Sequence, residues 1–194
     1  MLLGTFVKDV SAYLIRNPRY EELQNLFTQI LATEFHRAPK SLRSLLAGRA
    51  LQCATLVIDC DIVPRGEQGD NFKQAVMKFA FNQLCNADGM SVQLMAIRTL
   101  VRFARRVGEQ QLVAFEQLLG EILKPLLTLL DQAPLDCKYL PIEAISTFSK
   151  LNEQLVAQMS PQVTPKLLQL FRDHHSEGDL GSELVNLFKK WCNF

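Results

Sequence analysis

Apolar residues recur at intervals of three and four along almost the whole chain, and this spacing limits the possible folds more than any other feature. No segment alternates apolar and polar residues over a useful length, as a half-buried strand would. Turn-forming residues interrupt the pattern repeatedly, so the sequence predicts an all-helical protein. The predicted helices cover residues 2–16, 20–36, 41–58, 71–86, 91–107, 110–131, 136–151, 153–174 and 180–192.

Residues 91–107, SVQLMAIRTLVRFARRV, carry apolar residues on two sides of one predicted helix. One stripe consists of Val92, Ala96, Leu100, Phe103 and Val107, and a second of Leu94, Ile97, Val101 and Ala104. Between them runs a strip with Arg98, Arg102, Arg105 and Arg106. A helix needs apolar residues on more than one side when it packs on a hairpin partner and on neighbouring repeats. We therefore expect this helix to lie within a stack.

Several predicted helices superpose on one another, which indicates an internal repeat. The segments LLAGRALQCA, MAIRTLVRFA and LPIEAISTFS align Arg49, Arg98 and Glu143, at intervals of 49 and 45 residues, and ELVNLFKKW adds Asn186 after 43 more. These periods lie in and just beyond the range of about 40 to 47 residues of HEAT and armadillo repeats.

We therefore predict an all-α fold, a right-handed α-α superhelix of the HEAT or armadillo type that forms a single array over residues 1–194. It would contain about four helical hairpins and one leading helix. The predicted hairpins cover residues 20–58, 71–107, 110–151 and 153–193, and the leading helix covers 2–16.

The segment NADGMSVQLMAIRTL resembles the HEAT consensus for the second helix of a hairpin. Asp88 stands in the turn, and Val92, Ala96 and Leu100 follow at the expected positions. Gln93 stands where the consensus has an arginine. The departure removes one step of the Asp/Arg ladder of regular arrays, so the resemblance is to divergent HEAT repeats.

Divergent arrays of this kind resemble the importin-β, or karyopherin-β, family of nuclear transport receptors, from about Lys40 to the end of the chain. The similar segments are SLRSLLAGRALQCATLV, GMSVQLMAIRTLVRF, FEQLLGEILKPLLTLLDQ with its internal Pro125, and LPIEAISTFSKLNEQLVAQMSPQVTPKLLQLF. They are most like the importin 9 branch, with importins 7 and 8 close behind. Residues 1–39 match only as generic helices.

The resemblance implies a receptor whose inner helices bind protein cargo and the GTPase Ran, and whose outer helices bind FG-repeat nucleoporins. It also implies a protein of the cytoplasm and nucleus. Receptors of this family are several times longer than 194 residues, so we expect a fragment from the middle of such a stack. The alternative is a HEAT-type scaffold or adaptor for other protein complexes, because fold alone does not separate the two functions.

The composition favours protein partners over nucleic acid or membrane. The chain has 21 basic and 20 acidic side chains and a net charge of +1, so no overall field attracts nucleic acid or an anionic membrane. The longest apolar region, 118–130, is too short to span a membrane. Five widely spaced cysteines without a C-x-x-C pair indicate reduced thiols of an intracellular protein.

Arg98, Arg102 and Arg105 form an i, i+4, i+7 row, which is the first candidate binding site. If the second helix of each hairpin lines the concave side, the row suits an acidic partner, because guanidinium groups bind carboxylates in pairs. The structural alternative is that Arg105 and Arg106 compensate a helix C-terminus while Arg98 pairs with an adjacent repeat. Charge rows are usually solvated, which favours this alternative.

The predicted loop from Asp59 to Asn71 is the second candidate. It carries Asp59, Asp61, Glu67 and Asp70 against Arg65. Acidic loops in the resembled family often hold basic cargo, and long loops of repeat proteins are commonly functional. A solvated insertion is the simpler interpretation. The loop lacks the G-x-x-x-x-G-K-[ST] pattern that binds phosphate.

The sequence predicts neither an enzyme nor a cofactor or metal site. His174 and His175 are adjacent and so diverge by about 100 degrees on a helix, unlike an i, i+4 metal-binding pair. No histidine accompanies a serine or cysteine in a pattern typical of nucleophilic catalysis.

Overall fold

The computed structural model describes residues 19–32, 35, 38–59, 66–106, 109–151, 153–176 and 178–191. In these ranges the elements are α-helices and one 3-10 turn, without a strand, which confirms the predicted all-α class. The predicted helix at 2–16 lies outside the described residues. The elements are α2 (Tyr20–Ala32), α3 (Lys40–Asp59), α4 (Glu67–Asn86), α5 (Met90–Ala104), α6 (Glu109–Gln132), η1 (Leu135–Cys137), α7 (Tyr139–Phe148), α8 (Glu153–His174) and α9 (Gly178–Trp191).

Helix α4 begins four residues earlier than predicted, and the difference has a local cause. Gly66, at φ 78, adopts a backbone conformation that glycine reaches without strain. Glu67 and Asp70 then occupy the first turn, where the positive end of the helix dipole stabilises carboxylates. The prediction of a continuous loop from Asp59 to Asn71 was therefore wrong at both ends.

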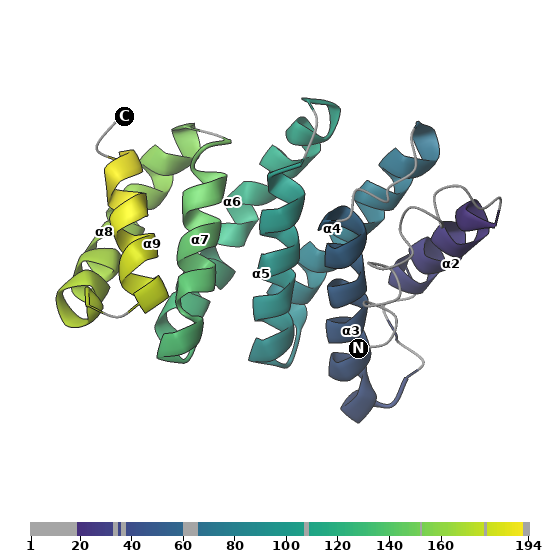
Figure 1. The fold of residues 1–194 in the computed structure, drawn as a ribbon, viewed down its shortest axis with the longest axis horizontal. Helices are drawn as coiled ribbons and strands as arrows, with labels where there is room; N and C mark the ends of the chain where they lie inside the picture. The colour runs from purple at the N-terminus through teal and green to yellow at the C-terminus, as the bar shows by residue number, and fades with distance from the viewer. Residues whose placement is uncertain are drawn as a thin grey trace. The chain divides into compact units, whose positions relative to one another are not determined.

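The chain divides into two compact units, residues 1–111 and 112–194, which we describe separately. In the first unit α3 and α5 lie side by side in one layer, and α2 and α4 form a second layer (Figure 1). Phe27 of α2 and Phe72 of α4 join the helices of the second layer, with their ring centroids 6.0 Å apart.

Helices α3 and α5 run parallel, and residues about 48 positions apart in the sequence lie at the same height along the two helices. Near their N-termini, Lys40 of α3 pairs with Asp88, just before α5, at 3.6 Å. Near their C-termini, the Arg106 guanidinium donates a hydrogen bond to the Ile58 carbonyl at 2.8 Å. The helices thus align N-terminus with N-terminus, as second helices of successive hairpins do in a repeat array.

In the second unit α7 and α9 lie side by side, with α6 and α8 in another layer (Figure 1). Phe115 and Phe148 make an edge-to-face contact between α6 and α7, with centroids 5.5 Å apart. Phe171 and Phe188 do the same between α8 and α9 at 5.7 Å. Each first helix is therefore joined to the second helix of its hairpin by a pair of aromatic rings.

The two apolar stripes predicted on α5 are both buried. The first stripe is buried at Val92, Ala96, Leu100 and Phe103, and the second at Ile97, Val101 and Ala104. Leu94 is half-buried, and Val107 lies outside the described residues. Because burial covers more than half of the helix circumference, the accessible side chains after the first turn of α5 are confined to the narrow strip that carries Arg98 and Arg102.

Candidate protein-binding surface

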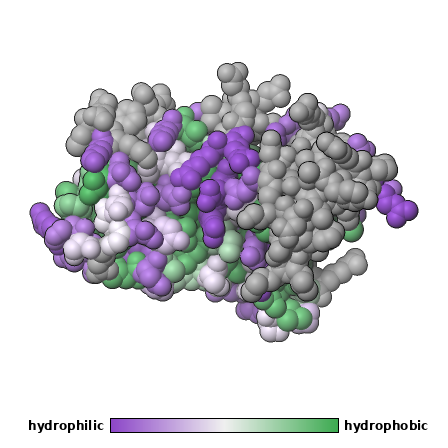
Figure 2. Space-filling view, viewed as in Figure 1, coloured by the Kyte–Doolittle hydropathy of each residue, from purple (hydrophilic) through white to green (hydrophobic). Residues whose placement is uncertain are grey.

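The predicted arginine row lies on the accessible strip of α5. Arg98 and Arg105 are exposed, and Arg102 is half-exposed, beside the half-buried Leu94 and Met95. Figure 2 shows strongly hydrophilic atoms gathered over α5. The strip is therefore available to a partner, as the sequence predicts.

Two buried threonines fix how α5 is turned against α3. Thr55 Oγ1 and Thr99 Oγ1 form a hydrogen bond of 2.8 Å, and both residues are buried. One hydroxyl donates to the other, and the accepting hydroxyl donates its own proton to a main-chain carbonyl: Thr55 Oγ1 lies 2.9 Å from the carbonyl oxygen of Leu51, and Thr99 Oγ1 lies 3.0 Å from that of Met95. Since a buried polar group without a partner is costly, the pair penalises rotation or sliding of α5. The arginine strip, on the side away from α4, is held in place by this contact.

Arg106 has a structural role, but on a different helix from the one expected. Its two guanidinium nitrogens donate to the carbonyls of Ile58 at 2.8 Å and Asp59 at 3.0 Å. These carbonyls end α3, where the helix dipole leaves negative charge and unpaired acceptors. Arg106 thus has a structural role, but the helix whose C-terminus it caps is the neighbouring α3 and not its own, as the alternative had expected.

Arg102 connects the two predicted sites. Its Nε lies 3.9 Å from Oδ1 of Asp59, and both side chains are more than one-third accessible. Exposed pairs of this length contribute about 0.2 to 1 kcal/mol, so the contact is readily exchanged for another carboxylate. Asp59 thus belongs with the arginine row.

The other predicted acidic residues do not join this cluster. Asp70 pairs with Lys73 of its own helix at 3.8 Å. Glu67, in the same first turn of α4, is exposed. Their position at the helix start accounts for both carboxylates without a ligand. Asp61 lies outside the described residues.

An exposed surface, which we call the α3–α5 face, combines residues of both helices on the side opposite α4. It consists of Leu42, Leu45 and Arg49 of α3, Leu94, Met95, Arg98 and Arg102 of α5, and Arg105. Arg49 and Arg98 lie at nearly the same height, since residues 48 apart are level at Leu51 and Thr99 and at Ile58 and Arg106. The exposed leucines of α3 were not predicted as part of a site, because apolar residues in a helical pattern read as core.

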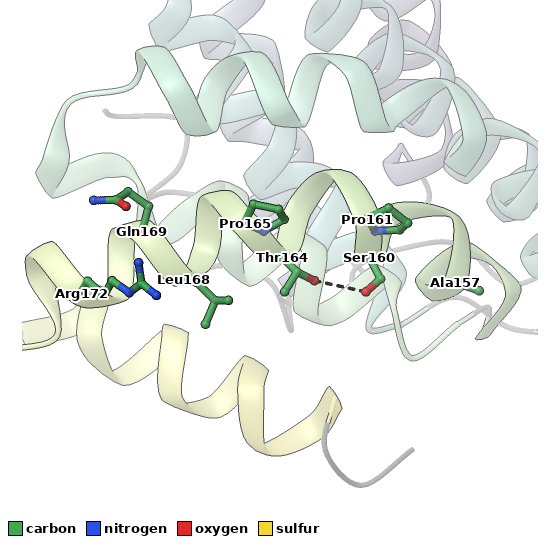
Figure 3. Close-up of a pocket in the computed structure, with 8 residues that line it drawn as sticks. All are labelled: Ala157, Ser160, Pro161, Thr164, Pro165, Leu168, Gln169 and Arg172. Atoms are coloured by element: carbon green, nitrogen blue, oxygen red, sulfur yellow. Dashed lines mark hydrogen bonds between the residues drawn. The ribbon is translucent and has the colours of Figure 1, made fainter.

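A second accessible region is an open groove of about 820 Å³ along α8, lined by Ala157, Ser160, Pro161, Thr164, Pro165, Leu168, Gln169 and Arg172 (Figure 3). Ser160 and Thr164 share a hydrogen bond of 3.1 Å between their hydroxyl oxygens. Arg172 is the one ionisable residue among the described residues of this lining. These residues therefore include no acid–base pair of the kind that general catalysis uses.

Other chemistry is sparse in the described part of the chain. No group of three or more potential metal ligands occurs among these residues, and no described helix is long and apolar enough to cross a membrane. His175 stacks beside Phe171 with ring centroids 5.8 Å apart. Cys53, Cys85 and Cys137 are thiols that are not joined in disulfides. Burial raises the pKa of Cys53, which makes that thiol less reactive.

Comparison of the chain with protein-family models, with curated proteins and with solved structures found no match in any of the three.

Proposed function

We propose that this chain is a non-enzymatic protein-binding scaffold built from stacked helical hairpins of the HEAT type. The observation that carries this proposal is the parallel pairing of α3 and α5, in which residues about 48 positions apart contact one another along the whole helix length. Such pairing is what a repeat of this period produces when hairpins stack. A right-handed superhelix over the full chain follows if the same stacking continues.

The accessible surface supports binding of protein. Stacked hairpins present one strip of each second helix, and contacts spread over several such strips hold an extended partner. On α5 the strip carries Arg98, Arg102 and Arg105, which are suited to paired carboxylates. The threonine pair that holds α5 against α3 is buried and separate from these three arginines, so a partner can bind them without disturbing that contact.

In its finer form, the proposal is a segment of an importin-β-type nuclear transport receptor. Its partners would be protein cargo, Ran and FG nucleoporins, and it would move between cytoplasm and nucleus. The support is the order of helix patterns from about Lys40 onward, including the internal Pro125, which here lies within α6 as the resemblance implies. A scaffold or adaptor for other complexes is the alternative.

The test is direct binding of the full chain to Ran and to an FG-repeat peptide. Ran loaded with a non-hydrolysable GTP analogue should bind more tightly than Ran loaded with GDP, and the FG peptide more tightly than one with serine in place of phenylalanine. Circular dichroism confirms that the chain is folded in each assay. If a folded chain binds neither ligand, the transport proposal is wrong and the adaptor alternative is favoured.

A further inference from the structure

The α3–α5 face has an apolar end and a basic end. At the N-terminal end of the two helices, Leu42 and Leu45 are 45% and 57% exposed. Leu94 and Met95 lie on the accessible strip of α5 at about the same height. Lys40 and Asp88 neutralise one another there, at 3.6 Å. The exposed leucines therefore lie at an end of the face where Lys40 and Asp88 offset one another, while Arg43 donates to the carbonyl of Ala38 at 2.9 Å.

Toward the C-terminal ends of α3 and α5 the face becomes basic. Arg49 and Arg98 lie at its middle, and Arg102 and Arg105 follow at the far end. Among the described residues of this end Asp59 is the single acid, and its contact with Arg102 is 3.9 Å long. At about 1.5 Å of rise per residue, the eleven positions from Leu94 to Arg105 separate the two ends by roughly 16 Å.

The charge of this layer is unlike that of the rest of the chain. Residues 40–59 and 90–106 contain seven basic side chains and one acidic side chain, a net charge of +6. The whole chain has a net charge of +1, so the remaining residues together carry −5. A local excess of this size attracts an acidic partner to these two helices.

The accessible residue types favour a protein partner over single-stranded nucleic acid. Proteins that bind single strands stack bases on exposed aromatic side chains beside the basic residues. In residues 40–59 and 90–106 the one aromatic side chain is Phe103, which is buried. Exposed leucines instead match the apolar side chains of a peptide.

We propose that the α3–α5 face binds an acidic protein segment in which apolar residues and carboxylates are grouped in separate blocks. The apolar block packs on Leu42, Leu45, Leu94 and Met95, and the carboxylates pair with Arg49, Arg98, Arg102 and Arg105. One carboxylate replaces Asp59 at Arg102. The inference rests on the proposed function as a protein-binding scaffold, and it is independent of whether that scaffold serves nuclear transport.

The test uses two synthetic peptides of about 18 residues with identical composition, measured by fluorescence anisotropy with the full chain. In the first peptide leucines occupy one half and glutamates the other, and in the second the same residues are evenly interspersed. We expect the blocked peptide to bind at least tenfold more tightly at about 0.1 M salt. Its affinity should fall as salt is raised, because charge pairs at the surface are screened.

Two matched pairs of variants locate the binding site. Arg49→Glu combined with Arg98→Glu should weaken the blocked peptide at least tenfold, whereas Lys78→Glu, an exposed change on α4 in the other layer, should alter it less than twofold. Leu45→Ser should weaken it about threefold to fivefold, whereas Leu168→Ser on α8 should leave it unchanged. All five substituted positions are exposed, so the variants should remain folded.

Equal affinity for the two peptides, or loss of affinity in Lys78→Glu as large as in the arginine variant, would overturn the inference. A single-stranded oligouridine that displaces the peptide and binds independently of Leu45 would show a nucleic-acid site instead. These results are separate from the Ran and FG measurements. Peptide binding without Ran or FG binding removes only the transport proposal, and the reverse result removes only this inference.

Discussion

In the first unit α3 and α5 lie side by side in one layer, and in the second unit α7 and α9 do the same. The two pairs are built from different side chains. Polar bonds link α3 to α5: a buried hydroxyl pair at Thr55 and Thr99, and the bonds from Arg106 to the end of α3. Helices α7 and α9 bring buried aliphatic residues to their unit, among them Ile142, Ile145, Leu180, Leu184 and Leu187.

Their exposed charge differs as well. Counting each helix with the turn that follows it, residues 40–59 and 90–106 carry a net charge of +6. Residues 139–151 and 178–191 carry three acidic and three basic side chains, a net charge of 0. The same arrangement of helices therefore carries a basic surface on α3 and α5 and no net charge on α7 and α9. In the unit with the charged surface, the hydrogen bonds of Thr99 and Arg106 fix the orientation of α5 against α3.

The largest expected effect is the loss of a buried leucine from α9. Leu184 is fully buried, so Leu184→Ala should lower the free energy of unfolding of its unit by about 2 to 5 kcal/mol. Trp191 is the chain's single tryptophan and lies in α9, so its fluorescence during urea denaturation reports this unit. The control Leu168→Ala, at an exposed position of the same unit, should change stability by less than about 0.5 kcal/mol. Similar effects of the two changes would mean that α9 is not held by apolar burial.

A somewhat smaller loss is expected where α9 begins. A Cβ added at Gly181 would lie 2.4 Å from the carbonyl oxygen of His175, so the two backbones could not keep their present approach. Gly181→Ala should therefore destabilise the second unit by about 1 to 3 kcal/mol.

Gly48 is the matched control, because a Cβ there meets no atom within 4 Å. Gly48→Ala on α3 should stabilise the chain by about 0.5 to 1 kcal/mol, since glycine is a poor helix former. Thermal denaturation followed by circular dichroism distinguishes the two. If Gly181→Ala instead stabilised the chain, the backbone at Gly181 would not approach the carbonyl oxygen of His175 as closely as described.

The hydroxyl pair of the first unit should show energetic coupling. Thr55→Val and Thr99→Val should each cost about 1 kcal/mol, because either change removes the hydrogen bond between the two hydroxyls and leaves the remaining hydroxyl with main-chain carbonyls alone. The double variant should cost less than the sum, with a coupling of about 0.5 to 1 kcal/mol in a double-mutant cycle. Thr99→Val combined with Ser149→Ala, whose hydroxyl bonds to Ile145 in the second unit, should be additive. Additivity in both cycles would remove the proposed role of the threonines in fixing α5.

The features that the sequence predicted correctly are those that depend on local periodicity. The helix pattern, the two buried stripes of α5 and the exposure of Arg98 all follow from spacing along one helix. The start of α4 was misplaced because Gly69 and Asp70 look like loop residues, whereas Gly66 makes the turn. Local residue types do not show which glycine the backbone uses.

The features that the sequence did not predict depend on contacts between residues far apart in the sequence. Thr55 and Thr99 are each a polar residue on an otherwise apolar, buried side of its helix, and the sequences of the two helices superpose. A polar residue on the buried side of both helices was the available signal for their hydrogen bond. The target of Arg106 could not be read from its own helix, since the carbonyls it binds belong to α3. Likewise, Leu42 and Leu45 fit a core pattern and are exposed only because of how α3 packs.

A basic side chain ends a helix in each unit, and removing it should have a modest effect. Arg106 bonds to the last carbonyls of α3, and the Lys138 ammonium donates to the carbonyls of Leu130 and Asp131 at the end of α6. Arg106→Ala should cost about 1 kcal/mol, and Lys138→Ala a similar amount. Amide hydrogen exchange should become faster in the last turn of α3 in Arg106→Ala, and in the last turn of α6 in Lys138→Ala. Faster exchange in α5 alone would contradict the assignment of Arg106 to α3.

The smallest expected effect is a pH dependence at Tyr20 of α2. Burial raises the pKa of Tyr20 to about 12, although the hydrogen bond donated by the Gln24 amide at 2.7 Å opposes this by favouring the phenolate. The unfolded chain, with an ordinary tyrosine pKa near 10, loses the proton first. Stability from this group is therefore complete below pH 10 and is lost as the pH rises toward 12.

Because Tyr20 is partly accessible, we expect the loss to be about 1 kcal/mol or less. Urea denaturation at pH 9 and pH 11.5 measures it as the difference between the native chain and Tyr20→Phe, which lacks the ionisable group. The native chain should lose more stability over this interval than the variant. Parallel loss in both would mean that Tyr20 ionises equally in the folded and unfolded states, and that α2 does not shield it in the first unit.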